Sequence, residues 1–216
     1  MTAVAATTTA PGEPLALYRD DGPLARALGP LLGGVVRVPG PVLMLAAVVP
    51  LVAAIALTGD TASDGLAAAV VAWAVLAGGA AAGRPLGGRV RWTVPPAVRL
   101  LEYAGLLWLA SLDGDAVTRA AFVLLAVLAF RHYDLVYRLR FQGATPPRWL
   151  GDAALGWEGR LIALWLLLAL DLLPAALWVA AGVLAVAFAA DCVAGWKRFG
   201  RDARPLHFDD EEDEAA

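Results

Sequence analysis

Six long apolar segments constrain this sequence more than any other feature. Each is close to the roughly 20 largely apolar residues that an α-helix needs to cross a bilayer. The segments are Pro41–Thr58, Asp64–Gly83, Pro95–Leu112, Ala116–Tyr137, Trp157–Leu173 and Pro174–Trp196. Hydrophobic residues make up 60% of the chain and charged residues only 17%, which excludes a disordered chain and disfavours a soluble globular enzyme. The sequence therefore predicts an all-α integral membrane bundle of about six transmembrane helices.

The basic residues indicate how these helices are threaded. Of the 17 Lys and Arg residues, 16 fall on one side of the predicted bundle, and Arg119 is the exception. Because cytoplasmic segments carry the excess of basic residues, we expect both termini in the cytoplasm, in a multi-pass protein of the plasma membrane. Tryptophans favour the membrane boundary, and those expected at its cytoplasmic side are Trp92, Trp149, Trp157 and Trp196.

The two ends of the chain differ from its apolar core. Residues 1–20 are small and polar and are expected to be disordered, whereas 21–199 are expected to form one six-helix transmembrane domain. Asp21–Gly34 is expected to begin it as a short interfacial helix with Asp21 as N-cap. Residues 200–216 include the run DDEEDE, which is typical of a solvated, disordered cytoplasmic tail. A docking role for this run is the alternative.

Ionisable residues lie at one common depth in the last four predicted helices. The uncharged core of the fourth, Ala120–Phe130, covers only about 16 Å of helix, against a hydrocarbon thickness of about 30 Å. Either Arg131, His132 and Asp134 lie within the inner leaflet or the membrane thins there. Charges at this depth cost several kcal/mol unless they are paired or hydrated. The candidate binding residues at this depth are Arg99, Glu102, Arg131, His132, Asp134, Arg138, Glu158, Arg160 and Asp191.

Helical spacing predicts how some of these charges pair. Arg131, Asp134 and Arg138 recur at i, i+3 and i+7 and so share one helix face. We expect Arg131 and Asp134 to form a buried set with Glu102 or Asp191 from a neighbouring helix.

Arginine clusters favour phosphate and carboxylate partners. The convergence of Arg99, Arg131 and Arg160 therefore predicts a cytoplasmic-side vestibule for an anionic lipid head group or a polyprenyl phosphate. Two alternatives stay open. The carboxylates can neutralise the arginines so that nothing binds, and Arg138 and Arg140 can simply anchor their helix by reaching lipid phosphates.

Motifs for metal or cofactor chemistry are missing from the sequence. The single cysteine, Cys192, excludes an intramolecular disulfide and a Cys-based zinc site, and two histidines are too few for a His-rich metal site. No phosphate-loop, zinc-protease or hydrolase motif occurs. We therefore expect no metal site, no cofactor and no nucleic-acid partner. The segment DGPLAR at 21–26 looks like part of the CDP-alcohol phosphotransferase signature, but Tyr18 replaces its first aspartate and GxxxDxxxD does not follow, so we treat the match as coincidence.

Five segments carry a broader resemblance that spans the chain from Tyr18 to Phe199. They are YRDDGPLAR, RLLEYAGLLWLA, AFRHYDLVYRLR, TPPRWLG and GWEGR. These segments resemble an uncharacterised actinobacterial family of multi-pass membrane domains, found alone or C-terminal to CDP-alcohol phosphatidyltransferase domains. The resemblance implies a context of phospholipid or cell-envelope lipid synthesis, with such a transferase as partner, and it supplies no catalytic residues.

Three functions remain after this comparison. The favoured one is an accessory membrane protein of lipid synthesis, because no intact catalytic motif is present. The alternative is a lipid-phosphate transferase of the CDP-alcohol type that uses Glu102, Asp134 or Asp191, and magnesium would be its cofactor. A small transporter is the third, and it is disfavoured because the polar residues cluster toward one side instead of the midplane.

Overall fold

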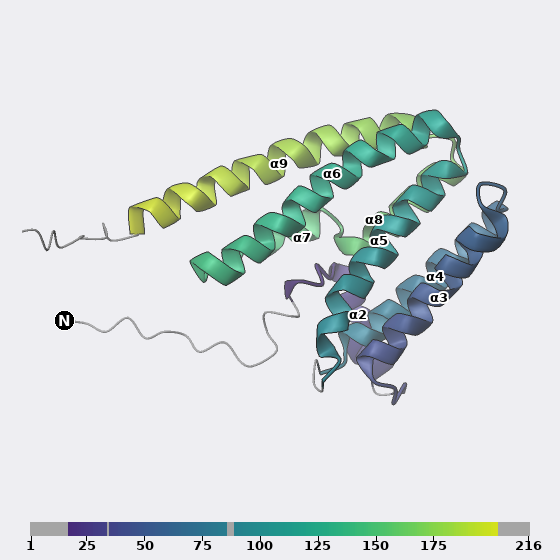
Figure 1. Ribbon diagram of the computed structural model, residues 1–216, viewed down its shortest axis with the longest axis horizontal. Coiled ribbons are helices and arrows are strands. Elements are labelled where there is room, and N and C mark those ends of the chain that lie inside the picture. Colours follow the sequence, from purple (N-terminus) through teal and green to yellow (C-terminus); the bar gives the residue numbers. More distant parts are fainter. Residues whose placement is uncertain (1–16, 34, 86–88, 203–216) are drawn as a thin grey trace, which may run out of the picture.

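The structure is a computed structural model that describes residues 17–33, 35–85 and 89–202. These residues form helices, with no strand among them (Figure 1). The helices are α2 (Pro23–Gly33), α3 (Gly40–Thr58), α4 (Asp64–Ala82), the 3-10 turn η1 (Arg91–Thr93), α5 (Val94–Ser111), α6 (Asp115–Tyr137), the π-helical turn η2 (Arg138–Gln142), α7 (Arg148–Ala153), α8 (Gly156–Ala169) and α9 (Leu173–Asp202). The acidic run near the C-terminus and residues 1–16 lie outside this description.

Each predicted apolar segment coincides with a helix, and in the described parts of the chain four helices have the length and composition to cross a membrane. These four are α3, α4, α6 together with η2, and α9. The fifth predicted segment is too long, since α8 has 14 residues, about 21 Å of helix. The chain turns after α8 because Asp171 adopts a positive φ of 56°. Beyond this turn, α9 continues to Asp202, past the predicted ends at 196 and 199.

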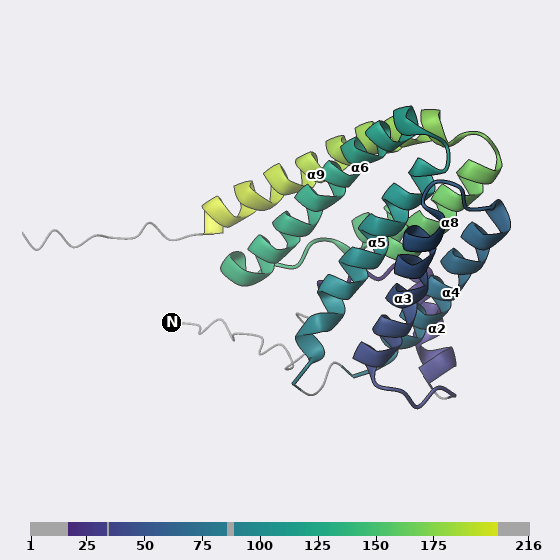
Figure 2. The ribbon, with the colours of Figure 1, turned by 45° about the vertical axis from the view of Figure 1, so that its right-hand side comes forward.

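The helices form two parts that diverge from one another. In Figures 1 and 2, α3, α4, α5 and α8 run together with α2 at one end, while α6 and α9 lie side by side as a pair. The pair is close to α5 and α8 where the chain turns between helices, and it separates from them toward the opposite end. The three turns at the close end follow α3, α5 and α8. The divergence leaves room at the other end for α7 and the segments around it.

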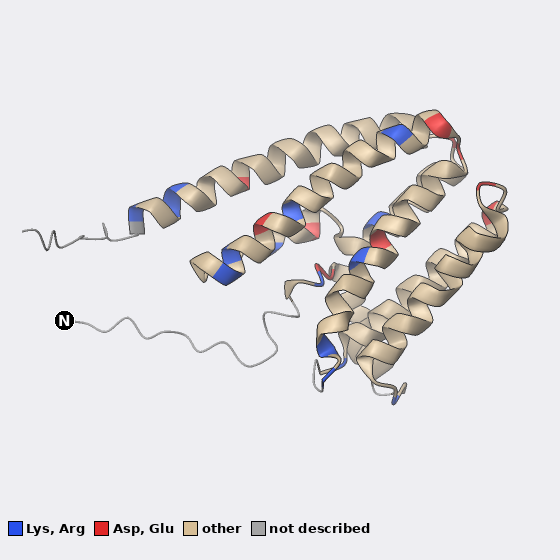
Figure 3. Ribbon diagram, in the orientation of Figure 1, with Lys and Arg blue, Asp and Glu red and all other residues tan. Residues whose placement is uncertain are grey.

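Charge is unevenly distributed between the two ends of the bundle. Figure 3 shows the basic residues mainly toward the end where the helix pair diverges, whereas acidic residues and Arg119 mark the turns at the close end. The turns Gly59–Ser63, Leu112–Gly114 and Leu170–Leu172 contain no basic residue. The sequence asymmetry is therefore also an asymmetry of the folded bundle.

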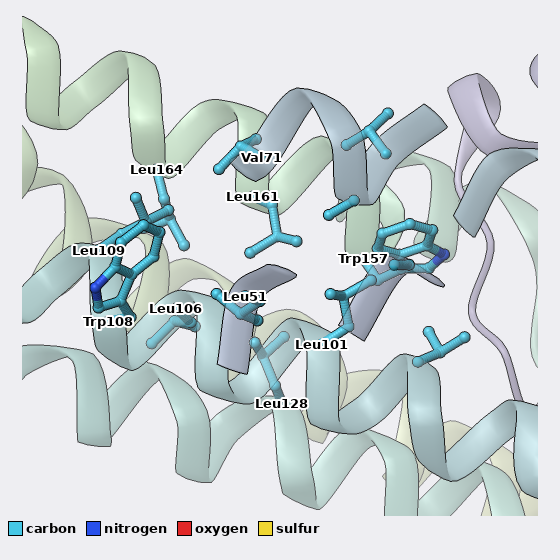
Figure 4. Packing of buried hydrophobic residues seen from close by; sticks show 14 of the residues in the cluster. Leu51, Val71, Leu101, Leu106, Trp108, Leu109, Leu128, Trp157, Leu161 and Leu164 are labelled. Carbon is cyan, nitrogen blue, oxygen red and sulfur yellow. The ribbon is translucent and has the colours of Figure 1, made fainter. Parts of the chain in front are cut away.

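Small residues allow the helices to pack closely around one large aromatic side chain. Trp157 is fully buried, and a Cβ on Gly78 of α4 would lie 2.5 Å from its indole ring. Figure 4 shows Trp157 near one end of the packed apolar cluster, with Leu101, Leu161 and Leu51 farther along it. The prediction of Trp157 as an interfacial aromatic residue is therefore wrong, because a glycine on α4 opens a site for its ring. Trp92 and Trp149 are both exposed.

The N-terminal segment is ordered closer to the start of the chain than expected. Arg19 is 2% exposed, so the predicted disorder is wrong for the described residues 17–20. The short helix α2 forms as predicted, but Asp21 does not cap it. The carboxylate of Asp21 instead accepts hydrogen bonds from Trp157 Nε1 at 2.9 Å and from Arg19 Nε at 2.7 Å.

Glu158, on α8, provides the cap for α2 from more than 130 residues away. Its carboxylate oxygens accept hydrogen bonds from the backbone N–H of Gly22 at 3.1 Å and of Ala25 at 2.9 Å. Free N–H groups at a helix start need such acceptors. The side chain can reach these groups because the backbone at Gly156 passes very close to the backbone at Gly22. A Cβ on Gly156 would lie 2.2 Å from the nitrogen of Gly22.

We expect Gly156→Ala to lower the free energy of unfolding by about 2–4 kcal/mol, since Gly156 combines a left-handed backbone with this close approach. The measurement is the unfolding midpoint of the purified protein in detergent. Gly65→Ala is the matched control, because nothing lies within 4 Å of the added methyl group. Equal midpoints for the two variants would contradict the proposed crossing.

Candidate functional site

Glu102 lies at the centre of a buried ion network, which we call the Glu102 network. Its side chain, on α5, is completely buried. One oxygen pairs with Arg99, one turn earlier on the same helix. The other oxygen accepts a hydrogen bond from Arg160 Nε of α8 at 2.7 Å, and Arg160 Nη2 lies 2.6 Å away. One carboxylate therefore neutralises guanidinium groups from two helices.

Asp20 and His132 complete the Glu102 network. Asp20 Oδ2 accepts a hydrogen bond from Arg160 Nη2 at 2.8 Å, and His132 Nε2 of α6 lies 3.4 Å from the same oxygen. The Tyr103 hydroxyl is 2.6 Å from the other ring nitrogen of His132. Burial alone would raise the pKa of Asp20, which precedes the membrane-spanning helices. The adjacent Arg160 guanidinium instead holds that pKa well below its ordinary value, so the carboxylate stays ionised.

The donors of the two arginines in this network are already occupied. Besides its carboxylate partners, Arg160 donates from Nη1 to the carbonyl of Ala154 at 2.9 Å. Arg99 donates from Nη2 to the carbonyl of Tyr18 at 3.0 Å and also to that of Arg19. Two carboxylates balance two guanidinium groups. The Glu102 network is therefore closed, and its arrangement is that of a structural ion cluster.

A second set of charges, which we call the α6–α9 network, joins the diverging helix pair. Asp134 of α6 and Asp191 of α9 are the carboxylates. Arg131 Nη1 lies 3.3 Å from Asp191 Oδ2 and 3.9 Å from Asp134 Oδ2. Arg138 lies 2.9 Å from Asp134 and 3.0 Å from Asp191. The predicted pairing of Arg131 and Asp134 with Asp191 is confirmed, whereas Glu102 belongs to the other network.

Arg138 keeps hydrogen-bonding capacity despite its two ion pairs. Its side chain is 2% exposed. Nη2 is ion-paired with Asp134 at 2.9 Å, whereas Nε is buried without a hydrogen-bond partner. The guanidinium group fits against α9 because residue 195 is glycine, where a Cβ would lie 2.8 Å from Arg138 Cζ. Buried donors without acceptors are costly. An incoming acceptor at this place would therefore be stabilising.

A large cavity, here called the basic cavity, lies beside Arg138. Its volume is about 950 Å³, and it opens between the end of α6, the segment before α7, and α9. Arg138, Gln142 and Arg198 supply its donors, and Gln142 Nε2 is buried without a partner. The other polar lining residues are Thr145 and Asp191, and Trp149 and Phe199 add aromatic surface. The π-helical turn η2 brings Arg138 and Gln142 to this wall.

The nine predicted binding residues therefore do not form one vestibule. Arg99, Glu102, His132 and Arg160 belong to the Glu102 network. The α6–α9 network contains Arg131, Asp134, Arg138 and Asp191, and Glu158 caps α2. Arg131 pairs across α6 and α9, whereas Arg99 and Arg160 share Glu102, so the described ion pairs do not bring these three arginines to one carboxylate.

Sequence reasoning missed residues that the fold brings to these sites. Asp20 was assigned to a disordered end, and Arg198 to the region after the sixth span. Gln142 and Thr145 carry no charge to draw attention to them. The extension of α9 to Asp202 brings Arg198 into the lining of the same cavity as Arg138. In the described parts of the chain, no three His, Cys, Asp or Glu side chains come together as metal ligands.

Glu102→Gln should lower the free energy of unfolding by about 3–5 kcal/mol, because it leaves two buried guanidinium groups without their shared anion. Unfolding midpoints in detergent measure the effect. Asp152→Asn is the control: Asp152 pairs with Arg26 at the surface, where both side chains are at least 40% exposed. Its loss should cost at most about 1 kcal/mol. A Glu102 variant no less stable than this control would show that the network is hydrated.

Comparison with known proteins gives a family and no function. No curated protein matches the chain, and no solved structure does. Residues 10–216 match one protein family, and the match covers both ion networks and the basic cavity. The chain belongs to DUF5941, a family of unknown function.

Proposed function

We propose that this protein is an integral membrane protein that binds the phosphate-bearing head group of an anionic lipid in the basic cavity. The observation that carries the proposal is Arg138, a buried guanidinium group in the cavity wall whose Nε has no hydrogen-bond partner. Arg198 adds a second guanidinium that no carboxylate of the described chain neutralises through an ion pair. Phosphate oxygens accept charge-assisted hydrogen bonds from such groups.

In this proposal α5 and α8 cross the membrane together with the four more apolar helices. The charges of α5 lie inside the bundle, where Glu102 is inaccessible and Arg99 is 16% exposed. Lipid therefore contacts an apolar surface, and the cost of the charges is offset by their pairing. The uneven distribution of basic residues supports six crossings with both termini and the basic cavity on the cytoplasmic side of the plasma membrane.

The biological role that fits this site is accessory to phospholipid or cell-envelope lipid synthesis. The resemblance described above supports that context and a CDP-alcohol phosphatidyltransferase as partner. The geometry favours binding over group transfer, because the carboxylates that a transferase would need are engaged. Glu102 is shared by two arginines, and Asp134 and Asp191 each contact arginine.

Cysteine labelling tests the proposed orientation. In a Cys192→Ser background, we expect Thr61→Cys to react with a membrane-impermeant maleimide from outside intact cells, because it lies in a turn without basic residues. Arg148→Cys should react only after the cells are opened. Reaction of both positions from outside would contradict an even number of crossings with cytoplasmic termini.

Native mass spectrometry tests the head-group site. We expect the protein, purified in detergent and mixed with phosphatidylglycerol, to retain this lipid, and Arg198→Gln to weaken retention roughly tenfold or more, the effect of losing one hydrogen bond to a charged group. Arg201→Gln is the matched control on the same helix, since Arg201 does not line the cavity. Equal retention by both variants, or none by the parent, would contradict the proposal.

A further inference from the structure

A second cavity, here called the apolar groove, lies between α8 and α9. Its volume is about 350 Å³. The walls are almost entirely aliphatic, with Ala163, Leu164 and Leu167 on α8 facing Ala180 and Leu184 on α9. Arg160 borders the groove, but its donors are occupied within the Glu102 network. The groove therefore offers apolar contact and no free charge.

The apolar groove and the basic cavity share one face of α9. The lining residues of α9 follow a spacing of three or four, which keeps them on a single helix face. In order, they include Ala176, Ala180, Leu184, Ala187, Asp191, Ala194 and Arg198. Beside this face the helix is buried at Ala181 and Phe188, and α9 packs along α6.

This face changes from apolar to basic along its length. Small side chains leave space beside the helix as far as Ala187, and charged residues follow from Asp191 onward. From Ala176 to Asp191 the helix rises about 22 Å. That length exceeds one leaflet, which is half of a hydrocarbon core of roughly 30 Å. The dimensions and the polarity match those of an acyl chain attached to a charged head group.

We propose that the apolar groove holds an acyl chain of the same anionic phospholipid whose phosphate lies in the basic cavity. This inference rests on the proposed function and extends it from a head-group site to a site for a whole lipid. The head group lies between Arg138 and Arg198, and the chain runs along α9 toward Ala176. A groove between two membrane helices is in contact with lipid chains, so the ligand enters sideways from the bilayer.

Photo-crosslinking tests the path of the chain. The probe is phosphatidylglycerol with a diazirine at the end of one acyl chain, supplied in phosphatidylcholine nanodiscs that contain the full-length protein. We expect adducts to concentrate on the groove residues Ala163, Leu167, Ala176 and Leu184. Adducts spread evenly over the exposed positions Val186 and Val193 of α9 would overturn the proposal.

A phosphatidylcholine probe with the same diazirine distinguishes a selected lipid from bulk lipid. Weaker labelling of the groove by this probe is expected, because its head group carries no net charge. Equal labelling by both probes would overturn the assignment to an anionic lipid. A dimer in native mass spectra with unlabelled groove residues would assign the groove to a second copy of the chain and also overturn it.

Matched tryptophan variants test the groove from the protein side. Ala180→Trp should fill the groove and lower its labelling roughly tenfold, whereas Ala189→Trp, on the exposed side of α9, should leave labelling unchanged. Equal labelling of these two variants would contradict the proposal. If Ala180→Trp does not fold, the positions of the adducts on the unsubstituted protein decide between the outcomes. Retained phosphatidylglycerol with scattered adducts rejects the groove alone, while no retention at all rejects the head-group site as well.

Discussion

The architecture depends on the ion pairs that Glu102 makes with Arg99 and Arg160. They join α5 to α8 inside the bundle, and Asp20 extends them to the segment before α2. Isolated charges would be expensive in this buried interior. Because these charges are paired and hydrogen-bonded, the less apolar helices α5 and α8 can pack among the four strongly apolar helices. Glu158 then fixes α2 on the same body by capping its first turn.

The α6–α9 network joins two helices and also borders the basic cavity. Asp134 and Asp191 hold α6 and α9 together, and each is shared by Arg131 and Arg138. The pair diverges from the remaining helices (Figure 2). The basic cavity opens beside Arg138, between the end of α6, the segment before α7, and α9. The Glu102 network is therefore buried with its arginine donors occupied, whereas the α6–α9 network contributes Arg138 to the wall of the basic cavity. The apolar groove lies farther along α9, on the same face of this helix.

Sequence patterns predicted the apolar helices and one charged face, because both depend on spacing along a single helix. The spacing of Arg131, Asp134 and Arg138 is an example. Depth in the membrane predicted which charges lie at one level, but it carries no information about their direction around the helix axis. Spacing and depth therefore left Glu102 and Asp191 open as partners of Arg131, and the structure pairs Arg131 with Asp191. Tertiary contacts such as Glu158 with the start of α2 leave no local signal at all.

The central claim is that the buried charges neutralise one another in two networks and leave the basic cavity for a lipid phosphate. An experimental structure of the protein in nanodiscs with phosphatidylglycerol tests this claim most directly. The account predicts phosphate density within hydrogen-bonding distance of Arg138 and Arg198, with Arg160 still bound to Glu102. A cavity that contains only water or a segment of the chain itself, or a lipid phosphate inserted between Arg160 and Glu102, would contradict it.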